Sequence, residues 1–287
     1  MFRSTVPLAA VLLFAGCRTG EESASRPRLE QWWQLYQQDS SDWPEARTRW
    51  YELGGDDRDT LVLSLIRQMV VMAPQPVRTE GGFEPGWKRP QRELLALPAE
   101  GCVPLLEEAL RAGRDHVSLE ALADTLAGFG AVDSLASVLD APQPGDTLEA
   151  RRHAVVGLVK AGGERAIARV GVRLRGEADW SARASAAEAL GNARYADRGR
   201  AATVLVAGLE DEDPFVVRKV CEALKKLEVR TAAPALALRY ARARRDGEED
   251  VAGWSVDALR HLTGERVAGD DPSLWKQAAD RAAARGR

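Results

Sequence analysis

One phrase recurs through the second half of this 287-residue chain. Each copy is an apolar, alanine-rich stretch that ends in a leucine. These leucines are Leu126, Leu158, Leu190, Leu224 and Leu259, and the gaps between them are 32, 32, 34 and 35 residues. A nearly fixed period of this size is typical of proteins that stack copies of one supersecondary unit, each burying its apolar face against the next. The repeat therefore predicts a stacked array.

Each copy has the pattern of two helices joined by a tight turn. The first helix contains the apolar phrase, and a turn such as Gly128-Phe129-Gly130 or Gly191-Asn192-Ala193 follows it. We expect the second helices at 132–139, 165–174, 201–209 and 232–240. No segment shows the strict alternation of a half-buried strand. The pattern predicts an all-α protein in which alanines allow close approach of the helices and Leu190 is a core residue.

The turn before the fourth copy carries a family resemblance. Asp211–Arg218 (DEDPFVVR) is similar to the inter-repeat turn and first-helix start of HEAT-like repeats, in the short bacterial form described as phycobilisome-lyase-type. Ala186–Gly191 fits the same pattern, and Arg151 and Arg183 precede their leucines by seven residues, where the family often has arginine. The period is also near that of tetratricopeptide repeats, but their tryptophan, Leu-Gly and tyrosine signature is absent.

The resemblance implies a right-handed α-solenoid of roughly six to seven HEAT-like helix pairs. We expect one solenoid over 29–287, with regular repeats at 115–264 and weaker copies before them. A helix at Leu29–Gln38 would cap the N-terminal end, and a helix within 272–285 would cap the C-terminal end, with Trp275 and Ala279 turned inward. In the helix expected at 57–72, the buried side would hold Leu61, Leu63, Leu65, Ile66 and Met69.

The N-terminus has the features of an export signal. Residues 1–16 contain Arg3 and a short apolar run, which is too short to span a membrane and is typical of a signal peptide. Phe14-Ala15-Gly16-Cys17 resembles a bacterial lipobox, which implies a lipid on Cys17 and a tether over 17–28. Arg18 is not the aspartate that retains such lipoproteins in the inner membrane, so we expect the outer membrane, facing the periplasm. The alternative is an ordinary cleaved signal with an incidental cysteine.

The other two cysteines, Cys102 and Cys221, lie several repeats apart. A disulfide needs Cα atoms within about 7 Å. We therefore expect two buried free thiols that behave as small hydrophobic residues.

The segment 73–90 interrupts the helical pattern with four prolines and three glycines. Neither a helix nor a central strand is expected to persist through it. Long loops inside compact domains are uncommon and are often functional. Phe83 and Trp87 in this loop either pack against neighbouring helices or contact a binding partner.

An arginine strip is the second candidate binding feature. Arg165, Arg169 and Arg173 recur every four residues and so share one face of a second helix, which in HEAT-like arrays lines the concave side. Arg239 and Arg242 would extend the strip. It would dock an acidic segment of a partner protein, or it is an ordinary charged face balanced by neighbouring acidic residues.

The sequence offers little support for catalysis. His116, His153 and His261 lie in different expected helices without paired-ligand spacing, so no metal site is expected. There is no GxSxG, CxxC or P-loop motif, and no cofactor or small-molecule substrate is expected. A net charge of −3 argues against nucleic-acid binding.

These observations together predict a membrane-anchored interaction scaffold of the bacterial envelope, not an enzyme. Two alternatives remain open. One is a structural subunit of an envelope assembly without a discrete ligand. The other is a lyase-like enzyme, which only the family's name suggests.

Overall fold

The computed structural model describes residues 53–79, 82–141, 147–265, 267 and 271–286. The expected signal peptide at 1–16, the lipidation site at Cys17, the tether at 17–28 and the cap helix at Leu29–Gln38 lie outside the described residues. The chain divides into two compact units, residues 1–125 and 126–287, which we describe separately.

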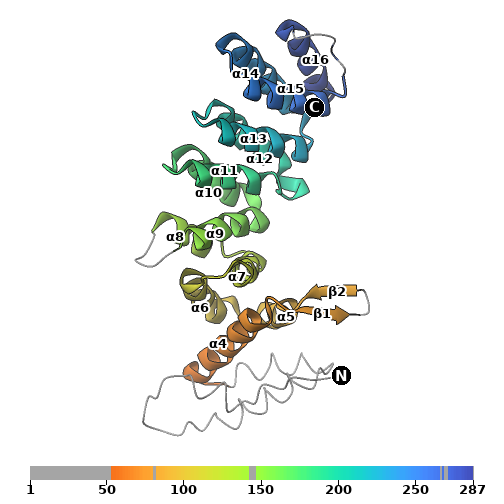
Figure 1. The fold of residues 1–287 in the computed structure, drawn as a ribbon. Coiled ribbons are helices and arrows are strands. Elements are labelled where there is room, and N and C mark those ends of the chain that lie inside the picture. The colour runs from red at the N-terminus through yellow and green to blue at the C-terminus, as the bar shows by residue number, and fades with distance from the viewer. Residues whose placement is uncertain (1–52, 80–81, 142–146, 266, 268–270, 287) are drawn as a thin grey trace. The chain divides into compact units, whose positions relative to one another are not determined.

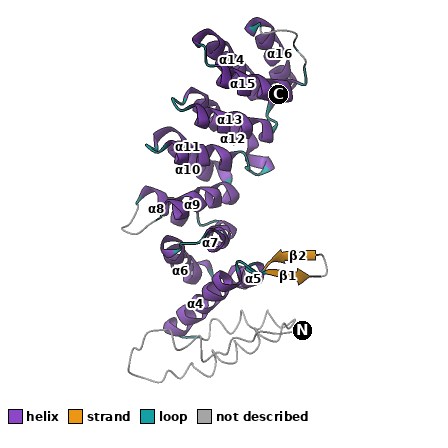
Figure 2. Cartoon of the chain, in the orientation of Figure 1, coloured by secondary structure: helices purple, strands orange, loops and turns teal. Residues whose placement is uncertain are grey.

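The first unit contains helices and one small hairpin. Its elements are α4 (Gly55–Met72), β1 (Pro76–Thr79), β2 (Gly82–Pro85), α5 (Lys88–Ala96), α6 (Ala99–Ala112) and most of α7 (His116–Gly128). Helix α4 packs against both α5 and α6. The two strands pair antiparallel, with Pro76 opposite Pro85 and Val77 opposite Glu84. Figure 2 shows the two strands of this hairpin in orange among the purple helices.

The buried face of α4 agrees with the expectation except at one position. Leu61, Leu65 and Met69 are fully buried, whereas Leu63 is 38% exposed and Val62 is buried in its place. The expectation for Leu63 was wrong because residues two apart on a helix lie about 200° apart, on opposite faces.

The second unit is an all-α solenoid. Its helices are α8 (Val132–Asp140), α9 (Leu148–Ala161), α10 (Gly163–Gly176), α11 (Trp180–Leu190), α12 (Arg198–Ala207), α13 (Pro214–Leu227), α14 (Ala233–Asp246), α15 (Glu249–Thr263) and α16 (Pro272–Arg285). Helices α9, α11, α13 and α15 pack side by side in one layer. In the second layer α10 contacts α8 and α12, and α14 contacts α16. Short 3-10 turns precede or follow some helices, at Tyr195–Asp197, Gly208–Glu210 and Arg230–Ala232.

The repeated leucines form the core of this stack, as predicted. Leu158, Leu190, Leu224 and Leu259 are all fully buried. Helices α11 and α13 approach closely where Gly191 faces Ala223: a Cβ on Gly191 would lie 3.0 Å from the Cα of Ala223. Small residues at such points allow the layers to pack to native density.

Aspartates cap two of the first-layer helices, α11 and α13. Asp179 accepts a hydrogen bond from the backbone N–H of Ser181 at the start of α11, and Asp213 accepts one from Phe215 at the start of α13. Side-chain oxygens in this position satisfy N–H groups that have no partner within the helix. The acidic turn before α13 thus satisfies the start of the next helix.

The C-terminal cap helix is also confirmed. It is α16, capped by Asp271, and its Trp275 and Ala279 are fully buried. Within the described ranges, none of the helices combines the length and apolar character needed to cross a bilayer.

Candidate functional site

The arginine strip is occupied by contacts between repeats. Arg165 on α10 pairs with Asp133 on α8. Arg169 lies 2.5 Å from Asp140, at the end of α8, and Arg173 lies 3.0 Å from the same carboxylate. Each arginine therefore reaches back to the preceding second-layer helix, and these inter-repeat ion pairs tie α10 to α8.

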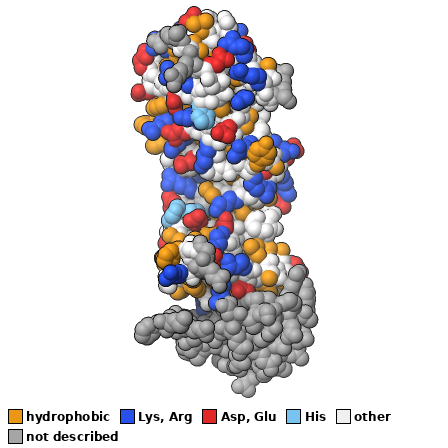
Figure 3. All heavy atoms as spheres, turned by 90° about the vertical axis from the view of Figure 1, so that its right-hand side faces the viewer, with side chains coloured by type: hydrophobic (Ala, Val, Ile, Leu, Met, Phe, Trp, Pro, Cys, Tyr) orange, Lys and Arg blue, Asp and Glu red, His pale blue; other side chains and the backbone are white. Residues whose placement is uncertain are grey.

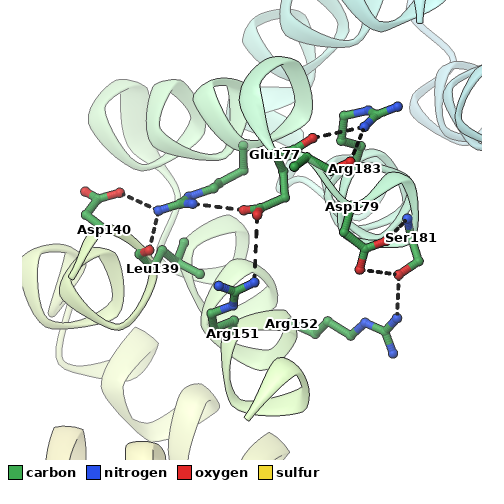
Figure 4. A network of polar contacts seen from close by, with 10 residues as sticks. Leu139, Asp140, Arg151, Arg152, Glu177, Asp179, Ser181 and Arg183 are labelled. Atoms are coloured by element: carbon green, nitrogen blue, oxygen red, sulfur yellow. Dashed lines mark hydrogen bonds and ion pairs between the residues drawn. The ribbon is translucent and has the colours of Figure 1, made fainter. Parts of the chain in front are cut away.

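Arg173 is the best connected of the three. Its guanidinium donates to the main-chain oxygen of Leu139 and, at 2.9 Å, to Glu177, which follows α10. Glu177 also lies 3.7 Å from Arg151 on α9. Figure 4 shows this chain of contacts from α8 through α9 and α10.

The other two predicted arginines have similar partners. Arg239 on α14 is 6% exposed; its Nε donates to the main-chain oxygen of Leu209 at 2.9 Å, and its Nη2 donates to Glu248 at 2.6 Å. Arg242 pairs with Glu210 of the preceding turn and lies 3.6 Å from Asp246. Docking an acidic segment on these cations would require internal pairs to break. The geometry favours the alternative of a charged face that is balanced internally.

The two loop aromatics occupy different environments. Phe83 on β2 is 76% exposed, whereas Trp87 is 3% exposed and lies at the start of α5. The Nζ of Lys88 lies 3.9 Å from the centroid of the Trp87 ring and 2.8 Å from Asp124 on α7. Trp87 therefore packs within the first unit, which is the first of the two roles expected for it. Its ring is not available to a partner.

Gly86 explains how the hairpin is held against α4. A Cβ at this position would lie 2.5 Å from the main-chain oxygens of both Met72 and Gln75. Only glycine permits so close an approach of two backbone segments. The interruption at 73–90 is thus a structured hairpin and not the irregular loop that its prolines and glycines suggested.

The ion pair of Arg183 and Asp211 was not expected from the sequence, although Arg183 holds a position where the family often has arginine. Arg183 on α11 donates to both Asp211 oxygens, at 2.7 and 2.9 Å, and to the main-chain oxygen of Glu177 at 2.9 Å. The hydrogen bond that the guanidinium donates to the Asp211 carboxylate raises the pKa of Arg183 above its ordinary value. The ion pair joins the starts of consecutive repeats, and Figure 4 shows Arg183 beside Glu177 at the start of its own repeat.

A cavity of about 650 Å³ lies between the starts of α13 and α15, within the second unit. We call it the acidic pocket. It is lined by Glu210, Asp211, Glu212, Pro214, Arg239, Arg242, Gly247, Glu248, Glu249, Asp250 and Val251. Six of these side chains are acidic and two are basic. Its size falls within the range of ordinary ligand sites.

Exposed aromatic residues also lie at the N-terminal ends of first-layer helices, as the acidic pocket does. Trp180 begins α11 and Phe215 is the second residue of α13; they are 48% and 54% exposed, and their ring centroids are 5.8 Å apart. One repeat further, the Arg218 guanidinium lies 5.8 Å from the ring centroid of Trp254 on α15. We call Trp180, Phe215, Arg218 and Trp254 the docking edge.

The charges on the stack are mixed. On the face of the helical repeats that Figure 3 displays, basic and acidic side chains are interspersed, with apolar side chains between them. This distribution agrees with arginines and lysines that have acidic partners nearby. On this face of the described residues the basic side chains do not form a continuous patch.

The two cysteines within the described residues are buried free thiols, as predicted. Cys102 and Cys221 are at most 1% exposed. Burial raises the pKa of each thiol from 9.0 to about 12, because a thiolate loses its hydration in an apolar interior.

Comparisons with known proteins support the helical-repeat architecture. Residues 168–260 match the family described as HEAT repeats. The match runs from within α10 to within α15, so this part of the second unit is similar to HEAT repeats. No curated protein matches the chain.

Two solved structures are similar at low identity. Human deoxyhypusine hydroxylase in complex with glycerol is 18% identical, with 85% of this chain and 92% of that chain covered and a TM-score of 0.38. The complex of CpcE and CpcF of phycocyanin lyase from Nostoc sp. PCC7120 is 19% identical, with 94% and 97% covered and a TM-score of 0.32.

Proposed function

We propose that this protein is a HEAT-like repeat scaffold that binds a partner protein and does not catalyse a reaction. A lipid on Cys17 holds it at the outer membrane, facing the periplasm. The stack supports the binding role because repeat arrays present extended surfaces on which partners dock. The lipobox-like sequence before Cys17 supports the anchor.

The observation that carries the binding role is the exposed pair of Trp180 and Phe215. Two large aromatic rings on consecutive repeats are about half exposed and lie 5.8 Å apart. Tryptophan and arginine are enriched among the residues that contribute most to protein–protein binding. Arg218 and Trp254 extend the same surface onto the next repeat. A partner can therefore bind to these anchor residues without breaking any ion pair of the second-layer arginines.

Affinity capture from membranes tests the binding role. The bait is the anchored full-length protein, and the variant is Trp180→Ser with Phe215→Ser. The matched control is Val172→Ser with Leu238→Ser, two apolar residues on the second layer that are 56% and 65% exposed. We expect one partner to be enriched with the wild type and the control and lost with the docking-edge variant. Equal recovery with all three baits would contradict the docking edge.

Cell fractionation tests the anchor. Replacing Cys17 with serine removes the thiol that carries the lipid, and a single substitution at that position is expected to move the protein from the membrane fraction to the soluble fraction. Several acyl chains are needed for durable attachment, because each buried CH₂ contributes only about 0.8 kcal/mol. Cys102→Ala is the control and should leave the protein at the membrane. A Cys17→Ser protein that stays at the membrane would refute lipidation.

A further inference from the structure

The acidic pocket contains a buried hydrogen-bond donor without an acceptor. Arg239 lines the pocket, and its side chain is 7% exposed. Its Nε and Nη2 are bonded to Leu209 and Glu248, but its Nη1 is buried and has no hydrogen-bond partner in the structure. Leaving a buried donor unpaired destabilises a fold, so such atoms are unusual and point to an acceptor that completes the site.

The rim of the pocket carries negative charge that its own arginines do not neutralise. Glu210 pairs with Arg242, and Glu248 pairs with Arg239. Glu212 is 91% exposed at its side chain and only 3.8 Å from the already paired Arg183. Asp250, at the start of α15, forms no ion pair with any residue that the structure describes. A ligand of the pocket therefore needs a cationic group as well as an acceptor.

We infer that the acidic pocket binds a lysine- or arginine-bearing segment of the partner protein. A main-chain carbonyl of that segment accepts from Arg239 Nη1, and its side-chain cation lies among the carboxylates of Glu212 and Asp250. This inference rests on the proposed protein-binding function. The pocket adjoins the docking edge, because Pro214 lines the pocket and directly precedes Phe215, so one partner could contact both.

Other ligand classes satisfy only half of the site. A metal ion cannot accept a hydrogen bond from a guanidinium. A polyamine has cations but no acceptor for Arg239. A simple anion accepts from Arg239 but meets the carboxylates at the rim, where like charges repel. A basic peptide supplies both groups at once.

Peptide binding to the purified full chain tests the inference. We would use the Cys17→Ser protein and a fluorescent acetyl-Gly-Lys-Gly-Lys-Gly-amide, and measure anisotropy at low salt. The variant is Glu212→Gln with Asp250→Asn, which keeps the side-chain shapes. Its matched control is Asp59→Asn with Asp280→Asn, two exposed acidic residues outside the pocket that remove the same net charge. We expect binding to wild type and control, and about tenfold weaker binding to the pocket variant, because it removes both carboxylates that would pair with the peptide's cations.

Competition with spermidine tests the acceptor. A peptide that uses Arg239 Nη1 should bind more tightly than spermidine, which offers cations alone. Equal loss of binding in the pocket variant and the control would show only non-specific attraction and overturn the inference. Tighter binding of spermidine than of peptide would also overturn it, in favour of a polyamine. If peptide binding fails while capture of the partner still depends on Trp180 and Phe215, the pocket is refuted and the proposed function stands.

Discussion

Arg183 and Asp211 form a doubly hydrogen-bonded ion pair between consecutive repeats, and both side chains are 8% exposed. Arg183 Nη1 donates to the main-chain oxygens of Glu177 and Ala178, at 2.9 and 3.2 Å. One guanidinium thus fixes the end of one repeat, its own helix and the turn that starts the next. A buried pair with these additional bonds avoids the main cost of burying charge, because few of its polar atoms lack partners.

Removing the arginine of this pair should destabilise the protein strongly. Arg183→Met leaves the Asp211 carboxylate buried without its partner, and such losses cost about 3–5 kcal/mol. Urea denaturation followed by circular dichroism measures the change. The matched control is Arg218→Met, which breaks the half-exposed pair of Arg218 and Glu222 and should change the free energy of unfolding by no more than about 1 kcal/mol. Similar losses of unfolding free energy in both variants would show that the buried Arg183 pair stabilises the protein no more than the half-exposed Arg218 pair does.

The repeated leucines should be sensitive to truncation. Leu190 is fully buried, so Leu190→Ala should lower the free energy of unfolding by about 2–5 kcal/mol through lost burial and the cavity that remains. Leu238 is 65% exposed, and Leu238→Ala should have little effect. An unchanged denaturation midpoint for Leu190→Ala would mean that this residue is not part of the core.

The close approach of α11 and α13 should not tolerate a methyl group. Gly191→Ala places a Cβ 3.0 Å from Ala223, so the helices must shift, at a cost of about 1–3 kcal/mol. Gly253 lies inside α15, where a Cβ would meet nothing within 4 Å. Gly253→Ala should therefore stabilise the protein by about 0.5–1 kcal/mol through helix propensity alone. Thermal melting of the two variants should shift in opposite directions, and a shift of Gly191→Ala towards higher temperature would contradict the packing described.

The two buried thiols should be unreactive in the folded protein. The thiolate is the reactive form, and burial raises the pKa of Cys102 and Cys221 to about 12, so both remain protonated at pH 8. In the Cys17→Ser protein, reaction with a thiol reagent should require unfolding and proceed at once in denaturant.

The same shifts predict how stability depends on alkaline pH. Below pH 9.0 the thiols are protonated in both states and contribute no pH dependence. Between 9.0 and about 12 the unfolded chain loses these protons while the folded chain keeps them, so the stability should decrease. Both predictions depend on the burial of the thiols. Fast reaction of either thiol with the reagent at pH 8, without denaturant, would show that its side chain is accessible to solvent and would contradict both.

Much of the fold could be predicted because its signals are local or periodic. The leucine period gave the repeat length, and prolines at 214 and 272, next to aspartates, marked helix starts. The hairpin was missed although Gly81-Gly82 is a turn signal between Val77 and Phe83, because the prolines suggested irregular structure. Helix α14 continues to Asp246, beyond the expected end at Tyr240. The sequence did not indicate its last turns because most of their residues are charged and exposed and give little apolar pattern.

The site was harder to predict because partners come from different repeats. Arg165 and Asp133 are 32 residues apart, which equals the repeat period, so their pairing could have been inferred from that spacing. The exposure of Phe215 also had a signal: it precedes Leu224 by nine residues, which is two and a half helical turns, on the opposite face. The acidic pocket had no such signal, because it depends on how the turns before α13 and α15 meet.

The central claim is that the second-layer arginines hold repeats together while the docking edge binds the partner. The most direct test is partner capture with Arg169→Glu and Arg173→Glu combined, measured beside the thermal midpoint of the same protein. Both substitutions place a carboxylate next to Asp140. We predict a lower midpoint and, below it, undiminished capture of the partner. An unchanged midpoint together with loss of the partner would show that these arginines bind the partner and would contradict the account.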